Sequence, residues 1–127
     1  MKILIVEDDV EVSQILNKRL TARGFHVLVA HAGEEALSIA VIQRPDLILI
    51  DIILPDIDGP EVVKQLRNNR DINPPIPVIF LSGIVGEVQK PAKTASVVVN
   101  GQVFPAISKP FVFEEVLSLI KQSLHLW

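Results

Sequence analysis

The sequence predicts an α/β fold in which a doubly wound sheet of five parallel strands is covered by helices on both faces. Short apolar runs rich in β-branched residues alternate along the chain with longer segments of helical periodicity, and this alternation is typical of repeated βα units. The strand runs are continuously apolar, as expected for strands that are buried on both faces of a parallel sheet.

Each element is assigned from its own pattern of apolar residues. The expected strands, in chain order, are Ile3–Val6, Val27–Ala30, Leu47–Ile50, Pro77–Leu81 and about Phe104–Ser108. The expected helices contain the apolar positions at helical spacing within residues 12–20, 36–41, 62–66 and 116–124. We find no internal repeat, low-complexity tract or linker, and therefore predict one domain over residues 1–127.

Local signals indicate where the helices begin and end. Gly24 follows the first helical pattern and Pro45 closes the second. Asp58 can cap the free N–H groups of the third helix, Pro60 fits its first turn, and Glu61 has the position that a capping box gives to an acid.

A hairpin is predicted in the second half of the chain. Residues 96–99 and 102–104 are rich in strand formers and flank the dipeptide Asn100-Gly101. Asn-Gly readily adopts the positive φ angles that a two-residue hairpin turn needs. We therefore expect this hairpin to form part of the segment that separates the fourth strand from the last one.

Two prolines shape the same segment. Pro91 interrupts any helix that begins at residues 86–88, so we expect an irregular or hairpin-containing segment in place of a regular fourth helix. Pro105 has no N–H to donate, and this places the last strand at the edge of the sheet.

The composition restricts the class of protein. The chain has 127 residues, of which 49% are hydrophobic and 21% charged, enough for one hydrophobic core. The net charge of −3 argues against direct contact with nucleic acid, and the absence of cysteine excludes disulfides and thiolate metal sites. The longest apolar stretch, residues 47–54, contains an aspartate and is far shorter than the ~20 residues of a membrane span. We expect a soluble cytoplasmic protein without membrane contact.

Polar residues follow several of the predicted strands where each strand ends. They are Glu7, Asp8, Asp9, Asp51, Ser82 and Lys109. Because the carboxyl ends of parallel strands meet at one edge of a sheet, these side chains should lie together. Crowded carboxylates repel one another, and a divalent cation relieves the repulsion. The all-oxygen set favours Mg²⁺, which keeps several waters. These water positions and the positive charge of the lysine could accommodate a phosphoryl group.

The ordered set of motifs resembles the receiver domain of two-component response regulators, in particular the chemotaxis-regulator type. The resemblance is based on Glu7-Asp8, the segment 51–59, Ser82-Gly83 and Lys109-Pro110-Phe111, and it covers nearly the whole chain. It implies a flavodoxin-like sheet with strand order 2-1-3-4-5. It also implies that the protein is a signalling switch and not an enzyme acting on a separate substrate.

The resemblance also implies a metal site. Asp8, Asp51 and the backbone carbonyl of Ile53 would bind Mg²⁺ directly, and Glu7 would act through a bound water. Asp9 aligns less well with the acidic pair of the family, and we expect it to cap the first helix.

A phosphoryl site is implied next to the metal. Asp51 would accept a phosphoryl group from a histidine kinase or a phosphotransfer protein. Ser82 would bond to a phosphoryl oxygen, Lys109 would neutralise its charge, and Gly83 would let the donor approach. A cis peptide bond between Lys109 and Pro110 is common in the family.

The chain departs from the family in ways that bear on signalling. Ala106 stands where receivers usually have an aromatic residue that reports phosphorylation, and Phe104 is at best a displaced substitute. With the altered segment before it, this predicts a non-standard output face. Ile53 and Ile84 offer no group to orient a hydrolytic water, so we predict slow autodephosphorylation.

Three other functions were compared with this interpretation. A haloacid-dehalogenase-type phosphohydrolase would carry its nucleophile after the first strand, and an FMN module would need a phosphate loop where this chain has three acids. A receiver fold that binds partners without phosphorylation stays the alternative. The output would pass through an effector protein or an effector domain outside this chain. His26, His31 and His125 lack ligand spacing and are expected to be surface or packing residues.

Overall fold

The computed structural model describes residues 1–83 and 95–126. Its strands are β1 (Lys2–Val6), β2 (His26–Ala30), β3 (Leu47–Asp51), β4 (Val78–Ser82), β5 (Ala95–Val99) and β6 (Gln102–Ser108). Its helices are α1 (Val10–Ala22), α2 (Gly33–Gln43), α3 (Gly59–Asn68) and α4 (Phe113–Leu124). Each helix within these residues coincides with one that the apolar periodicity predicts.

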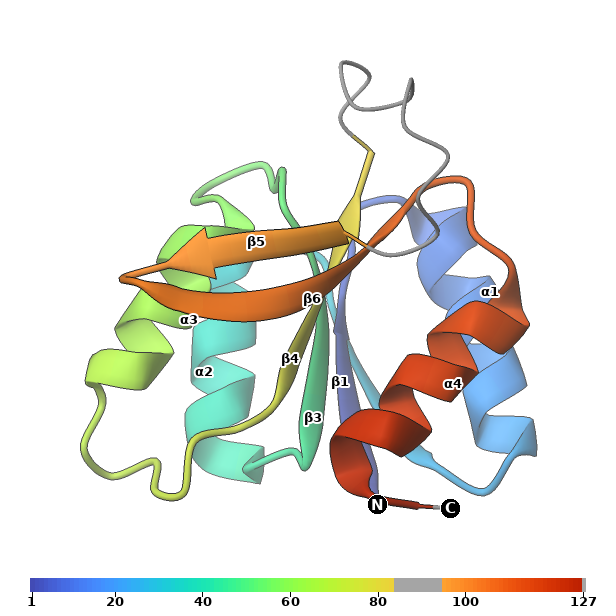
Figure 1. The fold of residues 1–127 in the computed structure, drawn as a ribbon, viewed down its shortest axis with the longest axis horizontal. Coiled ribbons are helices and arrows are strands. Elements are labelled where there is room, and N and C mark those ends of the chain that lie inside the picture. The colour runs from blue at the N-terminus through green and yellow to red at the C-terminus, as the bar shows by residue number, and fades with distance from the viewer. Residues whose placement is uncertain (84–94, 127) are drawn as a thin grey trace.

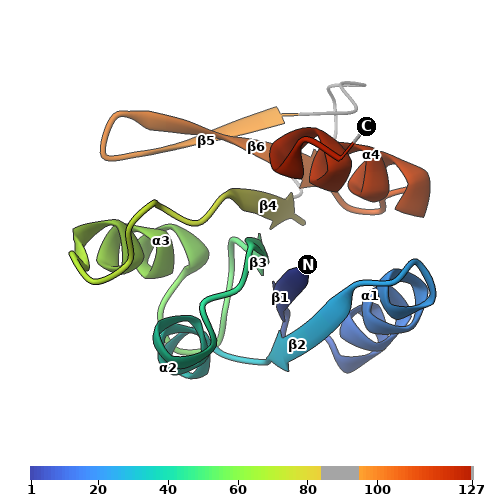
Figure 2. The ribbon, with the colours of Figure 1, turned by 90° about the horizontal axis from the view of Figure 1, so that it is seen from below.

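A single sheet with the strand order β2-β1-β3-β4-β6-β5 forms the centre of the molecule (Figure 1). Strands β1, β2, β3, β4 and β6 pair in parallel, whereas β5 pairs with β6 in the antiparallel direction. Helices α1 and α4 cover one face of the sheet, and α2 and α3 cover the other (Figure 2). The doubly wound α/β class predicted from the sequence is therefore confirmed.

The number of strands and the position of the last one were predicted incorrectly. The sheet has six strands among the described residues, and the hairpin strand β5 occupies the edge that was assigned to the last strand, β6. Pairing of β4 with β6 begins at Ala106, so Pro105 lies where β6 pairs with β5 alone. This position lets an interior strand contain a proline without losing a bond to its parallel neighbour.

The predicted hairpin is present. Asn100 and Gly101 have φ values of 51° and 80°, the positive angles of the two-residue turn expected from Asn-Gly. The hairpin buries one face against the core, where the Phe104 ring meets the Phe80 ring edge-on with centroids 5.9 Å apart. The predicted helix start at residues 86–88 and its interruption by Pro91 lie outside the described residues.

Two buried clusters, one on each face of the sheet, hold the helices in place. The cluster beneath α2 and α3 contains Ala36, Ala40, Val62, Val63 and Leu66, and the cluster beneath α1 and α4 contains Leu16, Leu20, Val116, Leu117 and Ile120. All residues of β3 and β4 are buried. The apolar interior fixes the strands, and hence the polar residues at their carboxyl ends.

Within the described residues, no helix has both the length and the apolar character needed to cross a membrane.

Helix caps tie the loops at the carboxyl edge to the helices that follow them. Asp9 accepts from the N–H groups of Glu11 and Val12 at the start of α1, and Asp58 accepts from Glu61 at the start of α3. Both caps were predicted. The carboxylate of Asp56 caps α2 from the β3–α3 loop, accepting from the N–H groups of Gly33 and Glu34 at 2.7 and 2.8 Å.

Candidate functional site

Asp51 lies at the carboxyl end of the most buried part of the sheet, with 7% of its surface exposed. Its backbone is approached closely by the start of α3, where the Gly59 N–H donates to the Ile52 carbonyl at 2.8 Å. A Cβ atom on Gly59 would lie 2.2 Å from the Asp51 carbonyl oxygen, which leaves no space for a side chain. Glycine at this position therefore allows α3 to support the loop that carries Asp51.

Glu7 and Asp8 extend from the end of β1 toward Asp51. Glu7 is fully buried and Asp8 is exposed, and carboxylate oxygens of Glu7, Asp8 and Asp51 all lie within 4.8 Å of one another. Three carboxylates without a nitrogen or sulfur ligand form a donor set that suits Mg²⁺, which prefers oxygen and keeps several waters. The residues therefore fit the predicted metal, and Asp8, which faces solvent, leaves access for a hydrated cation.

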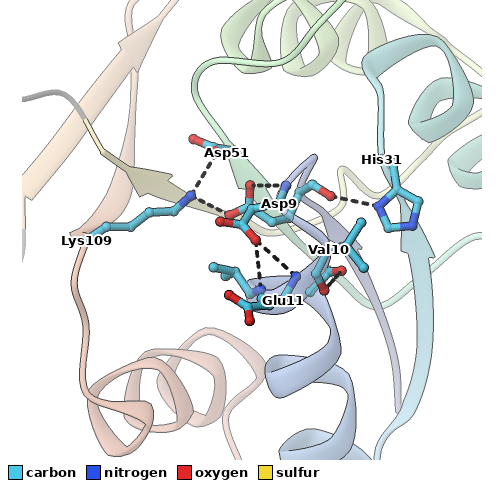
Figure 3. A network of polar contacts seen from close by, with 9 residues as sticks. Asp9, Val10, Glu11, His31, Asp51 and Lys109 are labelled. Atoms are coloured by element: carbon cyan, nitrogen blue, oxygen red, sulfur yellow. Dashed lines mark hydrogen bonds and ion pairs between the residues drawn. The ribbon is translucent and has the colours of Figure 1, made fainter.

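Lys109 connects the acids to the end of β6. Its Nζ donates to Oδ2 of Asp51 at 2.8 Å and to Oε1 of Glu7 (Figure 3). Its backbone N–H donates to the Ser82 carbonyl at 2.6 Å, which fixes the lysine beside the end of β4. The ammonium thus compensates two buried carboxylates at once.

The crowding of charge changes the acidity of this group of residues. Burial raises the pKa of the Glu7 carboxyl, and the neighbouring Asp51 raises it further, while the hydrogen bond from Lys109 works in the opposite direction. Desolvation alone would lower the pKa of Lys109, but its hydrogen bonds to Asp51 and Glu7 outweigh this effect, so its pKa is raised. Lys109 therefore stays cationic, whereas Glu7 holds its negative charge with difficulty unless another cation binds.

The remaining predicted site residues lie around this cluster. Ser82 is buried at the end of β4, beside the strand that leads to Lys109. Gly83 is exposed, and an added Cβ atom there would make an ordinary contact of 3.6 Å with Cδ of Lys109. The side chain of Ile53 is 63% exposed. The peptide bond between Lys109 and Pro110 is cis, as the resemblance implied.

His31 belongs to the same network, although it was expected to be only a surface or packing residue. Its ring Nδ1 lies 3.0 Å from the Glu7 carbonyl oxygen (Figure 3). Its backbone N–H donates to Oε1 of Glu35 at 2.8 Å. The residue follows β2, next to β1, so its position at a strand end is the signal that could have identified it. Asp9 is a helix cap, as expected, and is not part of the carboxylate cluster.

The sequence matches the profile of the family described as "Response regulator receiver domain" over residues 3–121. The chain belongs to this family. Among curated relatives, this receiver domain is 35% identical over 125 residues to response regulator MprA of Mycobacterium avium (strain 104) and 34% identical to MprA of Mycobacterium tuberculosis (strain H37Rv). In both comparisons the match covers 98% of this chain and 51% of the relative, so the chain spans about half the length of these relatives.

Solved structures agree with this assignment. The receiver domain of the hybrid histidine kinase CckA is 34% identical with a TM-score of 0.76, and the match covers 98% of this chain and 99% of that one. The chemotaxis response regulator CheY4 of Vibrio cholerae is 26% identical with a TM-score of 0.76, with coverage of 97% and 98%.

This receiver domain departs from the family at Ala106, and the structure shows what surrounds that residue. Ala106, at the position of the usual aromatic residue, is fully buried and pairs with Phe80 on β4 and with Ala95 on β5. Phe104 is buried against Phe80, and the Arg67 guanidinium lies 5.1 Å from the centroid of its ring. Strand β5 therefore pairs alongside β6, the strand on which receivers usually carry the aromatic residue, and Phe104 is a core residue.

Proposed function

We propose that this receiver domain is a phosphorylation-dependent signalling switch in which Asp51 accepts a phosphoryl group with the help of Mg²⁺. The observation that carries the proposal is the convergence of Glu7, Asp8 and Asp51 with Lys109 at one edge of the sheet. An acid at the end of an apolar strand is costly to bury, and this arrangement gives that acid both a compensating cation and room for another.

In the proposed reaction, an oxygen of the Asp51 carboxylate attacks the phosphorus atom of the donor. The bond from phosphorus to the donor breaks, and its electron pair leaves with the donor group. Lys109 is within reach of the carboxylate and would neutralise the charge of the phosphoryl oxygens. The Ser82 hydroxyl would donate a hydrogen bond to one of these oxygens. Asp8, Asp51 and the Ile53 carbonyl would hold Mg²⁺, with Glu7 acting through a water. The bound cation would supply charge neutralisation for the transferring group.

The proposed donor is a histidine kinase or a histidine phosphotransfer protein. A groove of about 520 Å³ adjoins Lys109 and would receive the donor; it is lined by Val12, Ile15, Gly83, Lys109, Pro110 and Phe111. The apolar side chains of α1 and of the loop after β6 provide a docking surface, while the lysine marks its reactive end. The downstream partner is an effector protein or an effector domain outside this chain.

We further propose that the phosphorylated state is long-lived. Hydrolysis needs a water oriented toward the phosphorus, and the exposed side chain of Ile53 has no polar group that could hold one. Ile84, the second residue of this argument, lies outside the described residues. The protein would catalyse only its own phosphorylation and dephosphorylation, and the cytoplasm is the expected location of both reactions.

Intact-mass spectrometry after incubation with acetyl phosphate tests the function. Wild-type protein should gain a single phosphoryl group in the presence of Mg²⁺, and the gain should disappear with a chelator and in Asp51→Ala. The alternative function is a receiver fold that binds partners without phosphorylation, and the exposed valines 98 and 103 of the hairpin favour it over an enzyme. A wild-type protein that gains no mass would support that alternative.

A further inference from the structure

We propose that His31 is a positioning residue that holds the Glu7–Asp8 peptide in the orientation needed for cation binding. The inference rests on the proposed function, because it assumes that Asp8 and Glu7 serve a Mg²⁺ site. The His31 side chain follows β2, 24 positions from Glu7 in the sequence, and reaches the acids through their backbone and not through their carboxylates.

His31 continues the pairing of β1 with β2 beyond the point where the backbone ladder stops. The register of the two strands ends at Val6 and Ala30, and the N–H of Glu7 then donates to the Ala30 carbonyl at 3.0 Å. The carbonyl oxygen of the same residue, Glu7, lies 3.0 Å from Nδ1 of His31. A carbonyl oxygen can only accept, so Nδ1 must carry the proton and donate it.

This contact controls the direction of the metal-binding acid that follows. The Glu7 carbonyl and the Asp8 N–H belong to one planar peptide unit, so fixing the carbonyl fixes the plane in which the Asp8 backbone begins. Asp8 is exposed, and its carboxylate accepts no hydrogen bond from any residue in the described ranges 1–83 and 95–126. Its orientation therefore depends on its backbone.

His31 is itself held from the other side. Its backbone N–H donates to Oε1 of Glu35, in the first turn of α2, at 2.8 Å. This bond anchors the His31 backbone, so less backbone entropy is lost when the imidazole forms its bond to Glu7. Glu35, His31 and Glu7 thus form a chain of contacts from α2 to the acid cluster.

Outer partners that orient metal ligands typically contribute about 10- to 100-fold to affinity. His31 acts through one peptide unit, so we expect its loss to weaken Mg²⁺ binding by about tenfold, the lower end of that range. The effect should appear in the Mg²⁺ dissociation constant and should vanish from phosphorylation at saturating Mg²⁺.

Two substitutions that match each other in shape separate the hydrogen-bond donor from the shape of the side chain. In His31→Asn, the amide nitrogen takes the place of Nδ1 and can still donate; in His31→Leu, a methyl group takes that place. His26→Leu is the matched control, because His26 is an exposed histidine at the start of β2, whereas His31 follows the end of that strand. Amide chemical shifts followed by NMR during a MgCl₂ titration give the dissociation constant of each variant, and urea unfolding without Mg²⁺ confirms that each is folded.

We expect His31→Leu to raise the dissociation constant about tenfold, with His31→Asn and His26→Leu close to wild type. Wild-type affinity in His31→Leu, or equal weakening in His31→Asn and His31→Leu, would overturn the inference. So would a folded His31→Leu that is phosphorylated poorly by acetyl phosphate even at saturating Mg²⁺. If the wild-type protein bound no Mg²⁺, the proposed function would fail as well; if it did bind, a failure of the His31 variants would concern this inference alone.

Discussion

Replacement of Lys109 by methionine tests the charge balance of the site. The ammonium is hydrogen-bonded to the buried carboxylates of Glu7 and Asp51, and in the described residues no other cation contacts them. Methionine has a similar length and keeps the apolar contacts of the lysine stem while removing its charge. The variant therefore leaves two buried acids facing each other without compensation.

The stability lost in Lys109→Met depends on the burial of the two acids and on the ability of Glu7 to take up a proton. Breaking a buried ion pair by removing one partner costs about 3–5 kcal/mol. Lys109 keeps 22% of its side chain exposed, and protonation of Glu7 would remove part of the repulsion. We therefore expect the free energy of unfolding to fall by about 2–3 kcal/mol in Mg²⁺-free buffer.

Mg²⁺ should recover much of this loss. The lysine charge repels a cation at the same acids, so Lys109→Met should bind Mg²⁺ more tightly than wild type does. Mg²⁺ stabilises the folded state of both proteins, but at one Mg²⁺ concentration the variant that binds it more tightly gains more stability. The difference in stability between wild type and variant should therefore shrink when Mg²⁺ is added.

Urea unfolding with and without Mg²⁺ measures both effects. Lys64→Met is the matched control, because Lys64 is exposed on α3 and should tolerate the change under both conditions. A Lys109→Met protein as stable as wild type in Mg²⁺-free buffer would refute the charge argument. A stability gap that stays constant on addition of Mg²⁺ would refute the claim that lysine and cation share the same acids.

Three further predictions concern a loop glycine, a helix cap and the hairpin turn. Gly59→Ala should destabilise the fold and displace Asp51, because its Cβ would lie 2.2 Å from a backbone oxygen. In Gly83→Ala the added Cβ would lie 3.6 Å from its nearest neighbour, so this variant should be tolerated. Thermal unfolding compares the two variants, and equal unfolding midpoints would count against the packing argument. The N–H groups of Glu34 and Gly33 lower the pKa of Asp56 to about 2 from an ordinary value of 3.8, so its cap stabilises the fold above the ordinary value and is lost as the pH falls through the lower one. Wild type should therefore lose its stability advantage over Asp56→Asn between about pH 4 and pH 2, and an advantage that does not change over this range in urea unfolding would contradict the prediction. Gly101→Val places a β-branched residue at a φ of 80° and should destabilise the hairpin by about 1–2 kcal/mol, and unchanged hydrogen exchange of the β5 amides would show that the turn does not depend on glycine.

Much of the architecture was predictable because each strand and helix leaves a strong local pattern. The acids at the strand ends were identified by the same reasoning, since a parallel sheet brings its carboxyl ends together whatever the sequence distance. The Asn100-Gly101 turn was also predicted, because few dipeptides adopt two positive φ angles readily.

The position of the hairpin in the sheet was not predictable by these rules. Pro105 correctly indicated a place with incomplete pairing, but the rule does not say which neighbour is missing, and β5 rather than β6 lies at the edge. Ala106 and Phe104 lie two positions apart on β6, yet the sequence does not reveal that β5 pairs with both. Tertiary pairing decides these questions.

The contacts of His31 and Asp56 were missed for a different reason. Each joins a side chain to the backbone of an element far away in sequence: His31 to Glu7, and Asp56 to the start of α2. Such bonds need a donor and an acceptor but no particular spacing. Asp56 lies just before α3 in the sequence, yet its carboxylate caps α2 and not the adjacent helix.

Asp51 is the residue that we propose carries the phosphoryl group. Borohydride reduction of the protein after incubation with acetyl phosphate and Mg²⁺ converts an aspartyl phosphate to homoserine, which tandem mass spectrometry of the peptides locates. We expect homoserine at position 51 in a Mg²⁺-dependent reaction, with Asp8, Asp9 and Asp56 unchanged. Homoserine at another aspartate, or none at any position in protein that binds Mg²⁺, would contradict it.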